Sequence, residues 1–199
     1  MGSSTASGGP PVFVVTGQSG AGKGTLIKRL LGRFAQLELA VSATTRPRRP
    51  GEVRGRDYYF ISEAEFDRML AGCAFLEYHV FPWGQRSGTL VSEIRRIAEE
   101  GRVCVLELET EGALAVAERI RGAVTVFVTA PLPELERRLR ERATESAGEI
   151  DERLRVAREQ LAVAVEFDHV VVNDDLDRAL EELASFVAPT LRAAATIAP

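Results

Sequence analysis

A single stretch near the N-terminus determines much of the fold, because an apolar run there leads into a glycine-rich loop and then into a helical pattern. Residues 12–15 are all apolar and typical of a buried strand, and residues 26–31 show helical apolar spacing. Between them, Gly17, Gly22 and Lys23 match the spacing G-x-x-x-x-G-K. This pattern predicts a P-loop, in which backbone N–H groups surround a phosphate at a helix N-terminus.

The loop supplies candidate ligands for a nucleoside triphosphate. Lys23 can reach the β- and γ-phosphates of a nucleotide as a point charge. The candidate ATP-binding residues in this segment are Gly17, Ser19, Gly20, Ala21, Gly22, Lys23, Gly24 and Thr25. Gly24 stands where the strict motif has Ser or Thr. Either Thr25 helps to hold Mg²⁺ through water, or water and the substrate phosphates hold most of the metal's coordination sphere.

The bulk composition limits the alternatives. A chain of 199 residues fits one domain with inserted subdomains, and a net charge of -4 gives no support for general nucleic-acid binding. Cys73 and Cys104 are expected to be thiols without a disulfide or a metal. No stretch approaches the roughly 20 apolar residues that span a bilayer, and the N-terminus lacks the apolar segment of a secretory signal. We therefore expect a cytoplasmic protein without a membrane segment.

Strand-like and helical segments alternate along the rest of the chain. Strand signals lie at residues 38–42, 58–61, 75–81, 103–108, 124–129 and 169–173. Helical signals lie at residues 63–70, 90–100, 113–121, 133–142, 151–165 and 176–187. This alternation predicts an α/β fold of three layers, with a mainly parallel sheet covered by helices on both faces. Ligands bind beyond the carboxyl ends of the strands in such sheets.

Changes in composition suggest the domain boundaries. A segment rich in Pro and Arg at residues 44–51 cannot be helical, and it opens a small mixed α/β insertion of about 42–89. We expect a single domain at 12–187 with its core at 12–41 and 90–187. We also expect a helical lid at about 140–153, a disordered arm at 1–11 and a tail with a frayed end at 188–199.

Together, these segments closely resemble the guanylate kinase family, from about residue 12 to residue 187. The matching motifs are SATTRPRRPGE at 42–52, GRDY at 55–58, FLE at 75–77 and VVNDDL at 171–176. The resemblance implies a P-loop nucleoside monophosphate kinase whose insertion binds the acceptor nucleotide. It also implies an Mg²⁺-dependent transfer from ATP to GMP or dGMP, with nucleotides as the partners and a monomer or homodimer as the active form.

The acceptor site is assigned partly by chemistry and partly by this resemblance. Two guanidinium groups three residues apart, in a segment held extended by prolines, can grip a phosphate dianion. The resemblance implies that Ser42, Arg46, Arg49 and Tyr58 hold the GMP phosphate, and that Glu77, Thr89 and Glu109 contact the base. Guanine presents N–H donors, which carboxylates accept. Glu109 stands where the family usually has Asp, and its longer side chain points either into the base or away from it.

The segment at residues 81–89 departs from the family pattern, and we interpret residues 82–89 as a loop. It is one residue longer than usual, and Ser87 replaces a phosphate-binding Tyr, for which Arg86 is a candidate electrostatic substitute. Glu111 also replaces the usual Gln. These departures suggest an alternative, a kinase of the same fold that acts on a modified purine nucleotide or a ribose bisphosphate. A noncatalytic phosphopeptide-binding module is a further alternative, and Lys23 argues against it.

Phosphoryl transfer requires positive charge around the migrating group. The catalytic candidates are Lys23, Arg46, Arg142 and Arg153, and Arg138 is assigned to the ATP side by the resemblance. For the three arginines near the lid, the alternative is an exposed helix face. Asn173 matches the family residue that contacts adenine, and its alternative is a helix N-cap, with Asp174 or Asp175 able to share that role.

Overall fold

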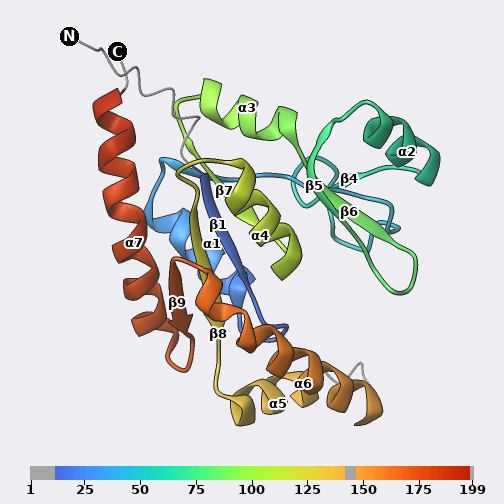
Figure 1. Cartoon of the computed structure of the whole chain (residues 1–199), viewed down its shortest axis with the longest axis vertical. Helices are drawn as coiled ribbons and strands as arrows, with labels where there is room; N and C mark the ends of the chain where they lie inside the picture. Colours follow the sequence, from blue (N-terminus) through green and yellow to red (C-terminus); the bar gives the residue numbers. More distant parts are fainter. Residues whose placement is uncertain (1–11, 142–146, 198–199) are drawn as a thin grey trace.

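The computed structural model describes residues 12–141 and 147–197 and contains a five-stranded and a four-stranded sheet (Figure 1). Neighbouring strands of the five-stranded sheet are all parallel, in the order β2-β7-β1-β8-β9. Its strands are β1 (Val12–Gly17), β2 (Leu37–Leu39), β7 (Val103–Glu107), β8 (Val124–Thr129) and β9 (His169–Val172). The predicted mainly parallel sheet is confirmed.

Helices cover both faces of this sheet, because alternate side chains of β1 enter two separate cores. Phe13 and Val15 pack in one core with α1 (Lys23–Arg33) and α7 (Leu176–Ile197). Val12 and Val14 pack in the other core with α3 (Val91–Glu99) and α4 (Thr110–Arg119). All six residues of β1 are buried. Because β1 is packed on both faces, it holds the glycine-rich loop that follows it in a fixed position at the carboxyl edge of the sheet.

The second sheet lies to one side of the first and has mixed pairing (Figure 1). Its order is β4-β3-β6-β5, with β3 (Ala43–Thr44) parallel to β4 (Tyr59–Phe60) and antiparallel to β6 (Arg86–Leu90), which in turn pairs with β5 (Phe75–Val80). The helix α2 (Glu63–Ala71) belongs to the same region. The sequence analysis interpreted residues 82–89 as a loop. Most of β6 was missed because its pattern RSGTL contains few residues typical of strands.

The boundaries of α6 (Ala147–Ala162) and α7 also differ from the prediction. The helix α6 begins before residue 151, follows α5 (Leu132–Glu141) and ends before a 3-10 turn at Ala164–Glu166. The helix α7 was expected to end at residue 187, but it continues past Pro189 to Ile197. The end of the helix is rich in alanine, which has a high helix propensity, and Leu191 packs against the core. Both the helix propensity and this packing stabilise the longer helix. The predicted arm at 1–11 and the last two residues lie outside the described part of the chain.

The two cysteines are free thiols, as expected, with Cys104 buried in β7 and Cys73 exposed after α2. None of the helices in the described ranges combines the length and the apolar character that crossing a bilayer would require.

Candidate functional site

The loop after β1 has the backbone shape that the glycine pattern predicts. Gly17 has a φ of 134°, and a Cβ added there would lie 1.9 Å from the carbonyl oxygen of Val128. Gly22 has a φ of 87°, and a Cβ there would lie 2.5 Å from Nδ2 of Asn173. The first turn of α1 has no acidic residue. Its free N–H groups therefore form an anion-binding end without a competing carboxylate.

Lys23 lies inside this loop. Its Nζ donates to the carbonyl oxygens of Gly17 at 2.7 Å and Gln18 at 3.1 Å. The carbonyl oxygens of Gly17 and Gln18 therefore hold the ammonium group at the carboxyl end of β1, beside the loop that is predicted to bind phosphate. Thr25 follows on the exposed side of the first turn of α1.

Arg138 and Asn173 both contact the loop. Nδ2 of Asn173 donates to the carbonyl oxygen of Ala21 at 2.6 Å, and Asn173 is 2% exposed. Arg138 donates through Nη2 to the backbone carbonyl of Asn173 at 3.1 Å and through Nε to Glu134 at 2.7 Å. The hydrogen bonds from Arg137 and Arg138 lower the pKa of Glu134 to about 2. Oδ1 of Asn173 is buried and has no hydrogen-bond partner among the described residues.

Asn173 is not the cap of α7. The carboxylate of Asp175 accepts the N–H of Arg178 at 2.8 Å, and Asp174 accepts the N–H of Asp175 at 2.7 Å. Of the two acidic candidates, Asp175 therefore caps the helix, and the amide of Asn173 turns toward the phosphate loop.

A cavity of about 200 Å³ lies beside Lys23 and joins the two sheets. Its lining includes Lys23, Ser42, Tyr58, Glu77, Glu107 and Glu109. Of the predicted residues, Lys23 from the donor side thus meets four from the acceptor side at this cavity, whereas Arg46, Arg49 and Thr89 are not among its lining residues. Glu109 lies at the start of α4 without a side-chain cap bond, and it is one of the residues that line this cavity.

Glu77 is the buried acid of this cavity. It is 9% exposed, and its Oε1 accepts the backbone N–H of Thr89 at 3.0 Å across the β5–β6 pair. A Cβ at Gly112 would lie 2.6 Å from its Oε2, so α4 packs closely against the carboxylate. Burial raises the pKa of Glu77. The hydroxyl of Thr89 is buried beside it and has no hydrogen-bond partner among the described residues.

Glu107 lies within the strand predicted at residues 103–108, but it was given no role in the site. It ends β7, next to β1 in the sheet, and lines the same cavity as Lys23. Desolvation in the cavity raises its pKa, against the opposing charge of Lys23. Its position at the carboxyl end of a central parallel strand was the signal that could have identified it.

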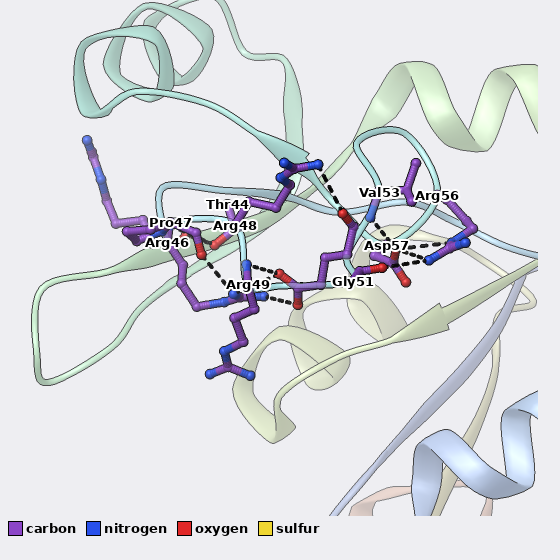
Figure 2. A network of polar contacts seen from close by, with 11 residues as sticks. Thr44, Arg46, Pro47, Arg48, Arg49, Gly51, Val53, Arg56 and Asp57 are labelled. Carbon is purple, nitrogen blue, oxygen red and sulfur yellow. Dashed lines mark hydrogen bonds and ion pairs between the residues drawn. The ribbon is translucent and has the colours of Figure 1, made fainter.

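An ion-pair network holds the predicted phosphate-binding arginines (Figure 2). Arg46 donates to Glu52 through Nη2 at 2.7 Å and Nη1 at 3.1 Å, and its guanidinium lies 5.2 Å from the centroid of the Tyr58 ring. Glu52 also accepts the backbone N–H of Arg49 at 2.7 Å. The hydrogen bond from Arg46 lowers the pKa of Glu52. The sequence analysis included Glu52 in a motif and missed that it organises both arginines.

Arg49 differs from Arg46 in its side chain. Figure 2 shows its guanidinium extending away from Glu52, and it forms no hydrogen bond or ion pair within the described ranges. Glu52 therefore holds the guanidinium of Arg46, whereas it holds Arg49 only through the backbone.

Arg86 does not substitute for the missing Tyr. It pairs with Val80 at the β5–β6 register and binds Glu63 and Asp67 of α2, the latter at 2.6 Å. Its guanidinium lies 4.4 Å from the centroid of the Phe66 ring. Because side chains alternate along a strand, Arg86 faces α2 whereas its neighbour Ser87 lines the cavity. The prediction for Arg86 was wrong because the loop was not recognised as a strand.

Two lid candidates are not placed. Arg142 lies outside the described residues, and Arg153 belongs to α6 without a described side chain.

Comparison with known proteins supports the earlier resemblance. The family model described as "Guanylate kinase" matches residues 10–190. The chain is 47% identical over 173 residues to a guanylate kinase of Rubrobacter xylanophilus, covering 86% of this chain and 90% of that protein. It is 45% identical over 173 residues to a guanylate kinase of Synechococcus elongatus, covering 86% and 94%.

A solved structure has the same architecture. The crystal structure of guanylate kinase from Anaplasma phagocytophilum matches with a TM-score of 0.71 and 26% identity, covering 92% of this chain and 85% of that one.

Proposed function

The chain belongs to the guanylate kinase family, and on that premise we infer that it transfers the γ-phosphoryl group of ATP to GMP or dGMP, giving ADP and GDP or dGDP. The observation that carries this inference is the position of Lys23, which is held by the phosphate loop and also lines the cavity that contains Glu77 and Glu109. A donor phosphate at the loop and an acceptor in the cavity would both lie beside this cation. Such an arrangement suits a direct transfer.

On the donor side, we propose that the loop residues named above and Lys23 bind the phosphates of ATP. Asn173 contributes its free Oδ1 to the adenine side, and Arg138 holds Asn173 through the backbone. Arg142 and Arg153 are proposed to neutralise the charge that develops on the migrating group. In the proposed division, the core spans 12–41 and 90–187, the insertion spans about 42–89, and the lid spans about 140–153.

On the acceptor side, Arg46, Arg49, Ser42 and Tyr58 would bind the phosphate, and the cavity would hold the base. Glu77 offers a carboxylate to the N–H donors of guanine, and Glu109 and Thr89 lie with it around the base. Burial of Glu77 excludes water from its carboxylate, which strengthens a hydrogen bond to the base. The cleft would also limit transfer to water.

The donor set fits magnesium. Within the described ranges, no three His, Cys, Asp or Glu side chains come together as a metal-binding group. Mg²⁺ needs no such group when it keeps its waters and binds substrate phosphates. The exposed hydroxyl of Thr25 and the carboxylate of Glu107 are the groups that could hold its water shell. When bound, Mg²⁺ would neutralise the phosphate oxygens of ATP.

We further propose a cytoplasmic monomer or homodimer whose partners are nucleotides and not nucleic acid. Two free thiols suit a reducing compartment, and the net charge of -4 does not favour polyanion binding.

The decisive experiment is an acceptor screen with ATP and Mg²⁺ in which ADP release is measured. The panel contains GMP, dGMP, AMP, CMP, UMP, IMP and a ribose bisphosphate. We expect GMP and dGMP to give the highest kcat/KM. Turnover of another acceptor with GMP inactive would support the changed-acceptor alternative. Phosphopeptide binding with no turnover would support the noncatalytic one. The comparisons favour neither alternative.

A further inference from the structure

The side chain of Gln18 connects the phosphate loop to two distant segments. It is fully buried, whereas glutamine is mostly exposed in proteins. Its Nε2 donates to the backbone carbonyl of Ala157 in α6 at 2.7 Å. Its Oε1 accepts the hydroxyl of Thr129 and, at 3.4 Å, the N–H of Ala130, both at the end of β8. The amide is therefore satisfied on both sides, and it bonds the loop to a helix 139 residues away in the sequence.

The loop does not depend on this side chain for its own shape. The backbone N–H of Gln18 donates to Val128 at 3.2 Å, and its carbonyl accepts from Ala21 at 3.2 Å. The same carbonyl accepts from Lys23 at 3.1 Å. All of these bonds use backbone atoms of Gln18. The side-chain amide is therefore free to hold the neighbouring elements.

The segment of α6 that Gln18 holds lies across a cavity from the phosphate loop. Val156 and Gln160 line this cavity of about 390 Å³, together with Ser19 and Lys23 of the loop. Positions 156, 157 and 160 follow the spacing of one helix face, and position 153 continues the same row one turn earlier. The bond to Ala157 thus fixes the distance between the loop and the helix that carries Arg153.

We propose that Gln18 is a positioning residue that fixes α6 against the phosphate loop for phosphoryl transfer. The inference rests on the proposed function, since it concerns the geometry of that reaction. Fixing the two elements in advance places the cationic groups of α6 relative to the migrating phosphoryl group, so that less orientation is left to the transition state. Apart from Lys23, the residues that line the acceptor pocket lie on other elements, and none of the lining residues is a partner of the Gln18 side chain.

Gln18→Met tests the proposal, because it nearly preserves the size of the side chain and removes both polar ends. We expect kcat to fall about tenfold, since positioning contributes to the transition state. KM for GMP and the dissociation constant of ADP should stay within about twofold, because the backbone bonds of the loop and the acceptor pocket remain. The matched control is Gln36→Met at an exposed position before β2, which should leave all of these constants unchanged.

The hydrogen bonds of the Gln18 side chain tie α6 to the phosphate loop, and we call this connection the tether. Hydrogen exchange measured on the same proteins reports directly on it. In Gln18→Met, amides of residues 155–162 should exchange about tenfold faster, while those of 12–17 stay protected. A kcat equal to that of the wild type, or a lower kcat without faster exchange in α6, would overturn the proposal.

Thr129→Val covers the case in which Gln18→Met does not fold. It removes the hydroxyl donor to Oε1 and should give smaller changes of the same kind, so wild-type behaviour would also reject the tether. If the wild type phosphorylates no nucleotide, the proposed function fails, but exchange in α6 still decides whether Gln18 holds the helix.

Discussion

The donor and acceptor sides of the cleft are held by different forces. The phosphate loop follows a strand in which all six residues are buried, and its shape comes from glycine backbone and from bonds to main-chain atoms. The acceptor arginines lie on a segment without regular structure and are held by the carboxylate of Glu52. Packing positions one side of the site, and a charged side-chain network positions the other.

This difference predicts different sensitivities. A closely packed region cannot accommodate added volume without moving its neighbours. An inserted methyl group on the donor side should therefore cause a large loss of stability and of phosphoryl transfer. An ion pair at a half-buried site is screened by salt and contributes modestly, so the acceptor side should lose function gradually. The substitutions below test this contrast from the largest expected effect to the smallest.

Gly17→Ala should have the largest effect. Its Cβ would lie 1.9 Å from the carbonyl oxygen of Val128, at a φ of 134° that L residues rarely adopt. The strand would have to move away from β8, at an expected cost of at least about 3 kcal/mol in the free energy of unfolding. Chemical denaturation measures this loss, and phosphoryl transfer should be abolished with it.

Gly32→Ala is the matched control for that substitution. Gly32 lies in α1, with nothing within 4 Å of an added Cβ. Alanine is the better helix former, so stability should rise by up to about 1 kcal/mol. Equal destabilisation by the two substitutions would mean that close packing does not define the donor side.

Lys23→Met should come next. Losing the one loop cation should lower kcat at least about 100-fold, because charge stabilisation at the transferring group is a large part of such catalysis. Stability should change by no more than about 1 kcal/mol, since the hydrogen bonds from Nζ to the loop carbonyls of Gly17 and Gln18 contribute modestly. Lys28→Met is the control, because Lys28 is exposed on the same helix and is the only other lysine. A Lys23 variant within fivefold of wild-type kcat would contradict the proposed role.

The donor side was largely predictable from sequence because its determinants are local. The glycine spacing and the apolar run of β1 both lie within a dozen residues, so the strand, the loop and the position of Lys23 followed from them. Gln18 was not predictable, because its partners at Thr129, Ala130 and Ala157 become neighbours only when the sheet and α6 assemble. A buried glutamine leaves no periodic signal.

The acceptor side was less predictable because its contacts depend on strand register. The resemblance gave the residue types, and the structure brings Ser42, Tyr58 and Glu77 to one cavity. It did not give the orientation of Arg86, which depends on whether residues 86–90 form a strand. A one-residue change in register moves a side chain to the opposite face. The role of Glu52 likewise depends on a turn that returns it to Arg46.

Glu52→Gln sharpens the contrast at the acceptor side. The neutral amide keeps an oxygen but loses the charge that orients Arg46, so KM for GMP should rise about three- to tenfold, with kcat little changed. Steady-state kinetics at low and high salt should show a smaller difference in high salt. Glu65→Gln, at a partly exposed site in α2, is the control. A lower KM would show instead that Glu52 competes with the acceptor phosphate for Arg46.

Glu77→Gln should have the smallest effect on stability, and its sign depends on pH. Burial raises the pKa of Glu77, so the folded protein holds this proton to higher pH than the unfolded chain does. The stabilisation from that proton is complete below the unfolded pKa and is lost as pH rises through the folded pKa. Glutamine never ionises. Relative to the wild type, the variant should therefore gain stability as the pH rises from the unfolded pKa through the folded pKa of Glu77, which denaturation at each pH measures.

Binding should follow the opposite course, because guanine donors need an ionised acceptor at Glu77. The KM of the wild type for GMP should rise as pH falls through the raised pKa, whereas the variant should have a higher KM with a weaker pH dependence. Titration of the GMP phosphate affects both proteins, so the ratio of their KM values isolates the carboxyl group. A ratio that stays constant with pH would mean that Glu77 does not contact the base in its ionised form. The acceptor side would then rely on Arg46 and Arg49 for most of its affinity, and the contrast with the packed phosphate loop would be larger still.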